Sequence, residues 1–279
     1  MSEQVREMFS SIARRYDVTN VVLSFGVDRW WRHVTVAAAG TGPGMRVLDC
    51  ATGTGDLALV FRRTGAEVVG TDFSPAMLVE AREKAKAAGL EVTFETADAL
   101  ALPYPDASFD VASISFGIRN VDDPVKCLQE MARVVKPGGK VLVLEFGQPR
   151  GLWGAMYRLY SRVVMPAVGG LLTGNRAAYQ YLPRTAAAFP AGEKFVDLMD
   201  QSGVFGSHAA KPSQAREKPR ARHSFRHTSH REDGAQALAR RCGSGWSKPD
   251  SAHPRRPVLP AAPRIFASRL YHTSILNEE

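Results

Sequence analysis

This 279-residue sequence has only three cysteines. We find in it no apolar run long enough to cross a bilayer and no pattern of an amino-terminal targeting signal. The three cysteines stand far apart and form no CxxC pair, so we expect neither a disulfide framework nor a zinc site. The first residues include Glu3 and Glu7 and lack an apolar core, which argues against a secretory signal and an acid-poor transit peptide. We therefore expect a cytoplasmic protein that holds no metal.

Net charge is absent from most of the chain. The total is +8, from 36 Lys and Arg against 28 Asp and Glu. Residues 206–279 carry 14 of the basic and 6 of the acidic residues, which leaves 22 of each in residues 1–205. Six of the seven histidines and seven of the 17 prolines also follow residue 205. Composition thus predicts a neutral folded domain over 1–205 and a basic, disordered tail over 206–279.

Two interpretations of the tail stay open. It is either a basic arm for nucleic acid or anionic lipid, or an unselected, shifted-frame extension without a partner. Its histidines are spaced too irregularly to predict a metal site. Only "RIFASRLYHTSIL", residues 264–276, offers a further strand. If the chain forms a five-stranded sheet and this segment does not pair with it, the fifth strand keeps an open edge. We would then expect an aggregation-prone protein.

Residues 45–146 alternate short apolar runs with amphipathic stretches. The runs "MRVLD", "EVVGTD", "EVTFETAD", "FDVASISFG" and "GKVLVLEF" predict strands, and helical patterns cover 57–64, 75–88 and 124–135. Residues 5–39 predict helices that precede them. This order is typical of an α/β fold with a doubly wound, mostly parallel sheet. Ligands of such sheets bind beyond the carboxyl ends of the strands, near the first turn from strand to helix.

That first turn is "DCATGTGD", residues 49–56. Residues 53–58 fit GxGxxA, a weak indication of a dinucleotide site. Asp49 and Asp56 would repel a pyrophosphate, whereas they would attract the ammonium and sulfonium of S-adenosylmethionine. We therefore favour S-adenosylmethionine, with its amino group on Asp49 and Gly53 and Gly55 allowing close approach of the backbone.

Further acidic residues follow the next two predicted strands. Asp72 is placed to accept both ribose hydroxyls, and Asp98 to accept the adenine amino group. The alternative is that Asp49 and Asp72 are ordinary turn residues at strand ends. The full set predicted to bind the cofactor is Asp49, Thr52, Gly53, Gly55, Asp72, Phe73, Met77, Asp98, Ala99 and Ser115.

Four stretches carry a closer resemblance, which covers about residues 5–205. They are "MFSSIARRYDVTNVVLSFGVDRWWR", "VLDCATGTGD", "SFGIRNVDDPVKCLQEMARVVKPGGKVLVLEF" and "YQYLPRTAAAFP". The chain resembles the ubiquinone/menaquinone biosynthesis C-methyltransferase family. The resemblance implies a class I, Rossmann-like methyltransferase with an N-terminal helical lid over 1–40 and a helical cap over 150–190. It differs at Ala51 or Thr52, where the family commonly has a second glycine.

The family's activity implies methylation of a ring carbon of a prenylated quinol, either demethylmenaquinol or the methoxy-benzoquinol precursor of ubiquinone. Such a reaction needs a phenolate, and hence a base or water relay and a cation near the oxygen. We predict that Arg119 stabilises the oxyanion or orients water, that Asn120 bonds a ring oxygen, and that Tyr16 closes from the lid. The alternatives are a surface or interdomain salt bridge for Arg119, and an N-cap and packing cluster at a helix junction for Asp17 and Asn20.

Residues 152–172 are apolar but interrupted by arginines, a proline and a glycine pair, too broken to span a bilayer. They predict a packed cap, a groove for a polyprenyl tail, or both. Expected partners are therefore the quinol and a membrane surface touched peripherally at its inner face; a second copy of the chain is compatible. Two other functions stay open: methylation of another hydrophobic phenol or a sterol, and a non-catalytic cofactor-fold protein that binds nucleic acid through its tail.

Overall fold

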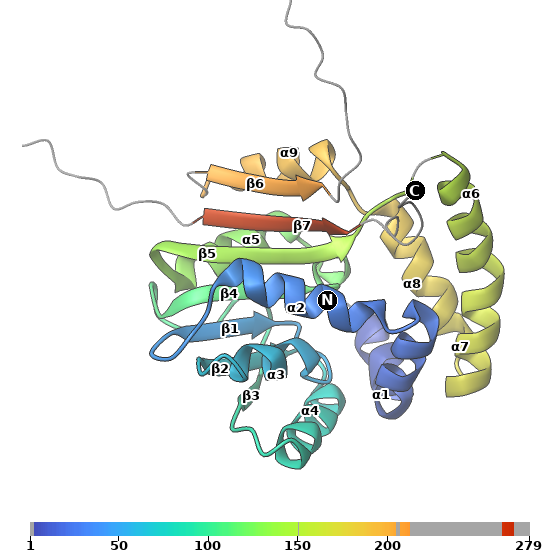
Figure 1. The fold of residues 1–279 in the computed structure, drawn as a ribbon, viewed down its shortest axis with the longest axis horizontal. Helices are drawn as coiled ribbons and strands as arrows, with labels where there is room; N and C mark the ends of the chain where they lie inside the picture. Colours follow the sequence, from blue (N-terminus) through green and yellow to red (C-terminus); the bar gives the residue numbers. More distant parts are fainter. Residues whose placement is uncertain (1–2, 150, 205–206, 213–263, 271–279) are drawn as a thin grey trace, which may run out of the picture. The chain divides into compact units, whose positions relative to one another are not determined.

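The computed structural model describes residues 3–149, 151–204, 207–212 and 264–270, which belong to one compact unit. A seven-stranded sheet with the order β3-β2-β1-β4-β5-β7-β6 forms its centre (Figure 1). Each of the six strand pairings is parallel. The predicted α/β fold with a parallel, doubly wound sheet is confirmed.

Five strands lie where the sequence predicts them, and two more extend the sheet beyond β5. The strands are β1 Arg46–Cys50, β2 Glu67–Asp72, β3 Thr93–Thr96, β4 Phe109–Ser115, β5 Val135–Phe146, β6 Ser207–Pro212 and β7 Arg264–Leu270. β7 lies within the segment 264–276 that the sequence offered as a further strand. β6 lies inside the predicted tail, so regular structure does not end at the predicted boundary after residue 205; residues 213–263 lie outside the described residues.

Helices cover both faces of the sheet because strand residues alternate between two cores. Val47 packs with α2 (Val27–Ala39), α3 (Asp56–Arg62) and α4 (Pro75–Ala87). Its neighbour Leu48 packs on the other face with α5 (Pro124–Val134) and α9 (Glu193–Ser202). Period-two alternation of this kind places successive side chains on opposite faces. The buried β-branched and aliphatic residues of β1, β4 and β5 therefore form the middle layer.

α1, from the predicted lid, and the helices of the predicted cap form one helical layer beyond the carboxyl ends of the strands (Figure 1). It contains α1 (Glu3–Ser24), α6 (Gly151–Leu159), the π-helical turn η2 (Tyr160–Val164), α7 (Met165–Thr173) and α8 (Arg176–Ala188). Ile12 and Leu23 of α1 pack with Tyr179 and Leu182 of α8 in a third core. A Cβ on Gly169 of α7 would lie 2.2 Å from the Tyr179 ring, so this close helix contact requires glycine.

No helix in the described part of the chain combines the length and hydropathy needed to cross a bilayer.

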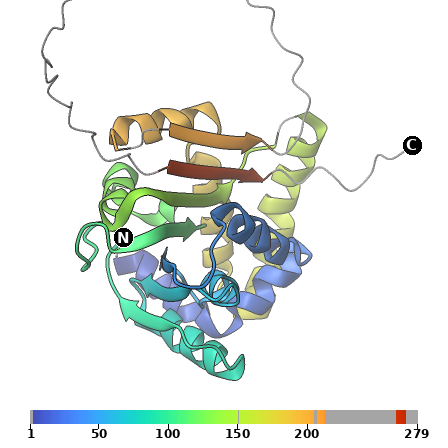
Figure 2. The same cartoon turned by 60° about the vertical axis from the view of Figure 1, so that its left-hand side comes forward.

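The edge of β5 is paired along its apolar half. β7 pairs with β5 from Lys140 to Phe146, and β6 pairs with β7 on its other side (Figure 2). Both added strands run parallel to β5. The edge of β5, which would be open without a further strand, is therefore covered by β7 and β6.

Candidate functional site

The glycine loop, residues 51–55, connects β1 to α3 and bends through three positive φ angles. These are 49° at Ala51, 58° at Gly53 and 81° at Gly55. The N–H of Thr52 donates to the Thr71 carbonyl at 2.9 Å, which joins the loop to the end of β2. A Cβ on Gly55 would lie 2.9 Å from the Phe94 ring, so close packing as well as φ demands glycine there.

Asp49 is buried near the carboxyl end of β1, beside this loop. Its two oxygens accept hydrogen bonds from the hydroxyls of Thr52 and Ser113, each at 2.7 Å. Burial raises the pKa of Asp49 to about 6, although both hydrogen bonds act to lower it. A buried carboxylate held only by neutral hydroxyls is a receptor for a cationic group such as an ammonium.

Asp72 ends β2 and holds the next backbone turn. Its Oδ2 accepts from the Gly53 N–H at 2.9 Å and its Oδ1 accepts from the Ser74 N–H at 2.8 Å. Burial raises the pKa of Asp72, against the effect of those N–H donors. Each carboxylate oxygen keeps a second lone pair, so the pair of oxygens can still accept the two hydroxyls of a ribose.

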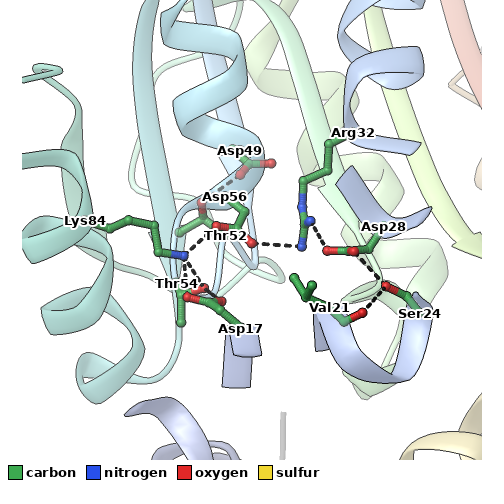
Figure 3. A network of polar contacts seen from close by, with 10 residues as sticks. All are labelled: Asp17, Val21, Ser24, Asp28, Arg32, Asp49, Thr52, Thr54, Asp56 and Lys84. Carbon is green, nitrogen blue, oxygen red and sulfur yellow. Dashed lines mark hydrogen bonds and ion pairs between the residues drawn. The ribbon is translucent and has the colours of Figure 1, made fainter. Parts of the chain in front are cut away.

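Asp56, the second acidic residue at the loop, does not face a ligand. Its carboxylate is paired with Arg32 of α2 at 3.0 Å and with Lys84 of α4 at 2.5 Å (Figure 3). Arg32 is paired in turn with Asp28. The prediction that carboxylates on both sides of the loop attract the ligand is therefore wrong for Asp56, because its carboxylate is already ion-paired with two cations. Of these two carboxylates, Asp49 is the one whose side chain forms no ion pair within the described part of the chain.

Asp17 of α1 contacts the glycine loop directly. It accepts a hydrogen bond from the Thr54 hydroxyl and forms an ion pair with Lys84 (Figure 3). Asp17 lies in the middle of α1, so the alternative of a helix cap is wrong for this residue. Farther along, the Ser10 hydroxyl lies 2.9 Å from that of Ser74, just after Asp72. The N-terminal helix thus covers both turns of the predicted cofactor site.

The other residues predicted to bind the cofactor lie at the same edge of the sheet. Asp98 accepts from the Leu100 N–H at 3.0 Å and orders the turn after β3, and Ala99 beside it is half-buried against the core. Ser115 ends β4, and Phe73 lies 6.0 Å below the Arg6 guanidinium. Met77 is fully buried in α4, within the core rather than on an open surface.

Arg119 follows β4 in the short helix η1, Ile118–Asn120, and forms a buried ion pair with Glu145 of β5. Its Nη1 lies 2.6 Å from Glu145 Oε1 and also donates to the Phe116 carbonyl. The two side chains are 3% and 9% exposed, so Arg119 does form a salt bridge, as the alternative expected, but in the interior and not at the surface. Within the described residues, Arg119 Nε and Glu145 Oε2 are buried without a hydrogen-bond partner. Such unpaired valences call for a ligand or water.

Tyrosines from three helices lie within the electrostatic influence of Arg119. The Arg119 charge acts on the pKa of Tyr16 in α1, Tyr157 in α6 and Tyr181 in α8, and burial raises the pKa of each phenol. A hydrogen bond with the Asn20 side chain acts to lower the pKa of Tyr16, against the effect of burial. The Tyr181 hydroxyl donates to Asn120 Oδ1 at 3.2 Å, which leaves the Asn120 NH2 group as a donor. The structure thus brings Tyr16, Arg119 and Asn120 together.

Sequence reasoning missed Glu145, Tyr157, Tyr181, Arg32 and Lys84. The position of Glu145 at the carboxyl end of a buried strand was an available signal, since charged residues are rare in such strands. Tyr157 and Tyr181 carried no such signal, because their roles depend on how the cap helices fold back over the sheet. Arg32 and Lys84 sit on amphipathic helices, where a charged residue usually faces solvent.

Comparisons with known proteins match this chain to one family of enzymes. The profile of the ubiE/COQ5 methyltransferase family matches residues 1–211. The chain is 55% identical to the ubiquinone/menaquinone biosynthesis C-methyltransferase UbiE of Bdellovibrio bacteriovorus, over 73% of this chain and 88% of that protein. It is 53% identical to the demethylmenaquinone methyltransferase of Thermus thermophilus, over 70% of this chain and 90% of that one. For the corresponding enzyme of Deinococcus radiodurans the identity is 50%, over 72% and 85%.

Proposed function

The chain belongs to the ubiE/COQ5 methyltransferase family and is an S-adenosylmethionine-dependent C-methyltransferase of the menaquinone and ubiquinone biosynthesis type; we propose that it methylates a prenylated quinol ring beside Arg119. The ring is that of demethylmenaquinol or of the methoxy-benzoquinol precursor of ubiquinone. The observation that carries the proposal is the buried Arg119–Glu145 pair, with one unpartnered atom on each side chain, at the same sheet edge as Asp49.

The residues at the ends of β1 and β2 fit the methyl donor. Asp49 would hold its ammonium, the positive φ angles at Gly53 and Gly55 would let the backbone approach, and Asp72 would accept the ribose hydroxyls. Asp98 would accept the adenine amino group. Thr52, Phe73, Met77, Ala99 and Ser115 complete the proposed set; Thr52 acts by fixing Asp49, and Met77 by packing behind the site. When bound, S-adenosylmethionine supplies a methyl group already activated on a sulfonium.

The protein's own work is to make the ring carbon nucleophilic. Ionising the quinol hydroxyl does so, and the Arg119 guanidinium stabilises the resulting phenolate. Glu145 Oε2 accepts the hydroxyl proton, directly or through water. As the ring carbon takes the methyl group it loses its hydrogen as a proton, and the quinol oxygen regains the proton it gave up, so the reaction releases one proton in total. The Asn120 NH2 group orients a quinol oxygen, and Tyr16 closes over the ring from α1.

We also propose the finer partner and location that the sequence suggested. The protein works in the cytoplasm, in peripheral contact with the inner face of a membrane, because its prenylated substrate dissolves there. Assembly as a homodimer stays a prediction.

The first test is calorimetric titration with S-adenosylhomocysteine, followed by a methylation assay. We expect micromolar binding that weakens about 100-fold in Asp72→Ala, because the ribose hydroxyls lose a charged acceptor. Asp72→Asn keeps one acceptor for the Gly53 or Ser74 N–H, and separates damage to the loop from loss of the ribose contact. Asp106→Asn, at an exposed carboxylate, is the matched control.

The acceptor panel should hold a short-chain demethylmenaquinol, a methoxy-benzoquinol, a simple phenol and a sterol. Methylation of a quinol carbon supports the proposal. A folded protein that binds S-adenosylhomocysteine and methylates only the phenol or the sterol would contradict it.

A further inference from the structure

The outer face of α6 and η2 exposes apolar side chains in a continuous series. Leu152, Met156 and Leu159 follow one another at i, i+4 and i+7, and are 76%, 53% and 67% exposed. Trp153 and Val163 are exposed beside them. A surface helix normally turns such a stripe toward the core and its polar residues outward. Here the apolar stripe faces outward.

A second apolar stripe on α1 meets the first. Val18, Val22 and Phe25 are exposed at i, i+4 and i+7 of the segment that ends α1, with Phe25 78% exposed. The Phe25 and Tyr160 rings are 6.4 Å apart, and the Tyr160 hydroxyl donates to the Leu23 carbonyl at 2.7 Å. These contacts join α1 to η2. We call the residues Phe25, Leu152, Trp153, Met156, Leu159 and Val163 the outer apolar face.

Charge of one sign accompanies this face. Residues 146–192 contain five arginines and no Asp, Glu or Lys. Two of these arginines, Arg158 and Arg162, are exposed on α6 and η2. Among the described residues neither one forms an ion pair. An exposed apolar stripe with unpaired cations beside it is the pattern of a helix that lies in the interface of an anionic bilayer.

The same helix also reaches the active site. Tyr157 lies between Met156 and Arg158 in the sequence but is mostly buried, where the charges of Arg119 and Glu145 act on its pKa. One face of α6 therefore contributes to the site around Arg119 while the other carries the apolar stripe. A lipid surface on the outer face would lie one helix away from that site.

We propose that the outer apolar face docks on the surface of a lipid bilayer that carries anionic headgroups, with its apolar side chains among the acyl chains and Arg158 and Arg162 at the phosphates. This docking deepens the proposed function and rests on it for its purpose: the prenyl tail stays in the bilayer while the quinol ring reaches Arg119. A second copy of the chain fits less well, because a two-fold contact across this face would oppose arginine clusters of like charge.

The test is sedimentation of the full chain with vesicles of phosphatidylcholine alone or mixed with phosphatidylglycerol. Met156→Gln with Leu159→Gln keeps the helix and removes two apolar anchors, and we expect its partition coefficient to fall about 100-fold. Val79→Gln, at an exposed apolar residue of α4, is the matched control and should change binding less than twofold. Arg158→Gln with Arg162→Gln should lower binding to the anionic vesicles about 30-fold and leave binding to phosphatidylcholine nearly unchanged.

The basic residues after residue 205 give a second route to anionic vesicles, so each measurement is repeated at about 0.5 M salt, where charges are screened beyond about 4 Å. Binding that the Met156 and Leu159 changes leave intact at both salt concentrations would overturn the proposal. So would a dimer in sedimentation equilibrium that these changes dissociate while vesicle binding stays the same. Methylation of a short-chain quinol in detergent should survive both changes. Failure of wild-type protein in that assay, with vesicle binding retained, would count against the proposed function and not against docking.

Discussion

Burial raises the pKa of the Asp49 carboxyl above its ordinary value. Its pKa of about 6 in the free protein lies above the value of about 3.9 expected for an unfolded chain. A raised carboxyl pKa means that the folded state binds the proton more tightly. Its contribution to stability is therefore present below about pH 4 and is lost as the pH rises through about 6. The difference amounts to about 3 kcal/mol in the free energy of unfolding.

Asp49→Asn should separate stability from cofactor binding. Above about pH 6 we expect the variant without ligand to be more stable than the wild type by about 1 to 3 kcal/mol, because it buries no charge. Its affinity for S-adenosylhomocysteine should fall at least tenfold, because the ammonium loses its carboxylate. Urea unfolding at about pH 5 and about pH 7.5, with titration calorimetry at the higher pH, measures both effects. An unchanged affinity would remove Asp49 from the proposed site.

Glu145 gives a second prediction at the residue scale. Glu145→Gln keeps a hydrogen-bond acceptor for Arg119 but removes the proposed proton acceptor, so kcat should fall about 100-fold to 1000-fold. Binding of S-adenosylhomocysteine should stay within twofold, because the proposed function puts Glu145 beside the ring and not the cofactor. The pH profile of kcat separates the two possible roles. A proton acceptor predicts that the residual activity rises with pH as the quinol ionises by itself, whereas a purely structural role predicts a uniformly lower profile.

At the scale of elements, Lys84 of α4 forms ion pairs with α1 and α3 beside the glycine loop. Its Nζ lies 2.5 Å from carboxylate oxygens of Asp17 in α1 and Asp56 in α3, and 3.1 Å from the Thr54 hydroxyl. All three charged side chains are about one-third exposed or less, so the pairs are only partly screened by solvent. α1 is thus held to the glycine loop, beside the predicted cofactor site.

Lys84→Met should loosen the lid more than it destabilises the fold. We expect the free energy of unfolding to fall by about 1 kcal/mol or less. Dissociation of S-adenosylhomocysteine should be several-fold faster in stopped-flow displacement, because α1 leaves the loop more often. Lys86→Met, on the exposed side of the same helix, is the control and should change neither value. Equal dissociation rates for both variants would show that α1 does not gate the site.

The elements also mark how far sequence reasoning reaches. Asp49 and Asp72 could be placed at strand ends because alternating apolar runs fix both the strands and their direction. Arg119 could be placed beside the site, but not as half of a buried pair, because Glu145 comes from a strand 26 positions farther along the chain. Asp56 was assigned the wrong role for a similar reason: Arg32 and Lys84 reach it only after two helices pack across the loop.

At the scale of the molecule, the sheet is completed by a strand that lies far along the chain. β7 lies between β5 and β6, and both pairings are parallel. Two parallel strands need a long connection between them, so no short turn motif after β6 could have predicted that β7 pairs with it. The apolar residues of 264–276 gave the only signal, and they could not indicate direction or register.

A proline in β7 should therefore open the sheet. Ala267 pairs with Val143 on one side and Ala210 on the other, so Ala267→Pro breaks a ladder bond in an internal strand. We expect the free energy of unfolding to fall by about 2 to 4 kcal/mol, and light scattering to rise as the edge of β5 becomes available to other chains. Ala210→Pro makes the same change in the edge strand β6 and should cost at most half as much, because that strand has one neighbour. Equal stability of wild type and Ala267→Pro in urea would mean that β7 does not contribute to folding. The five strands β3-β2-β1-β4-β5 would then be sufficient for a stable sheet.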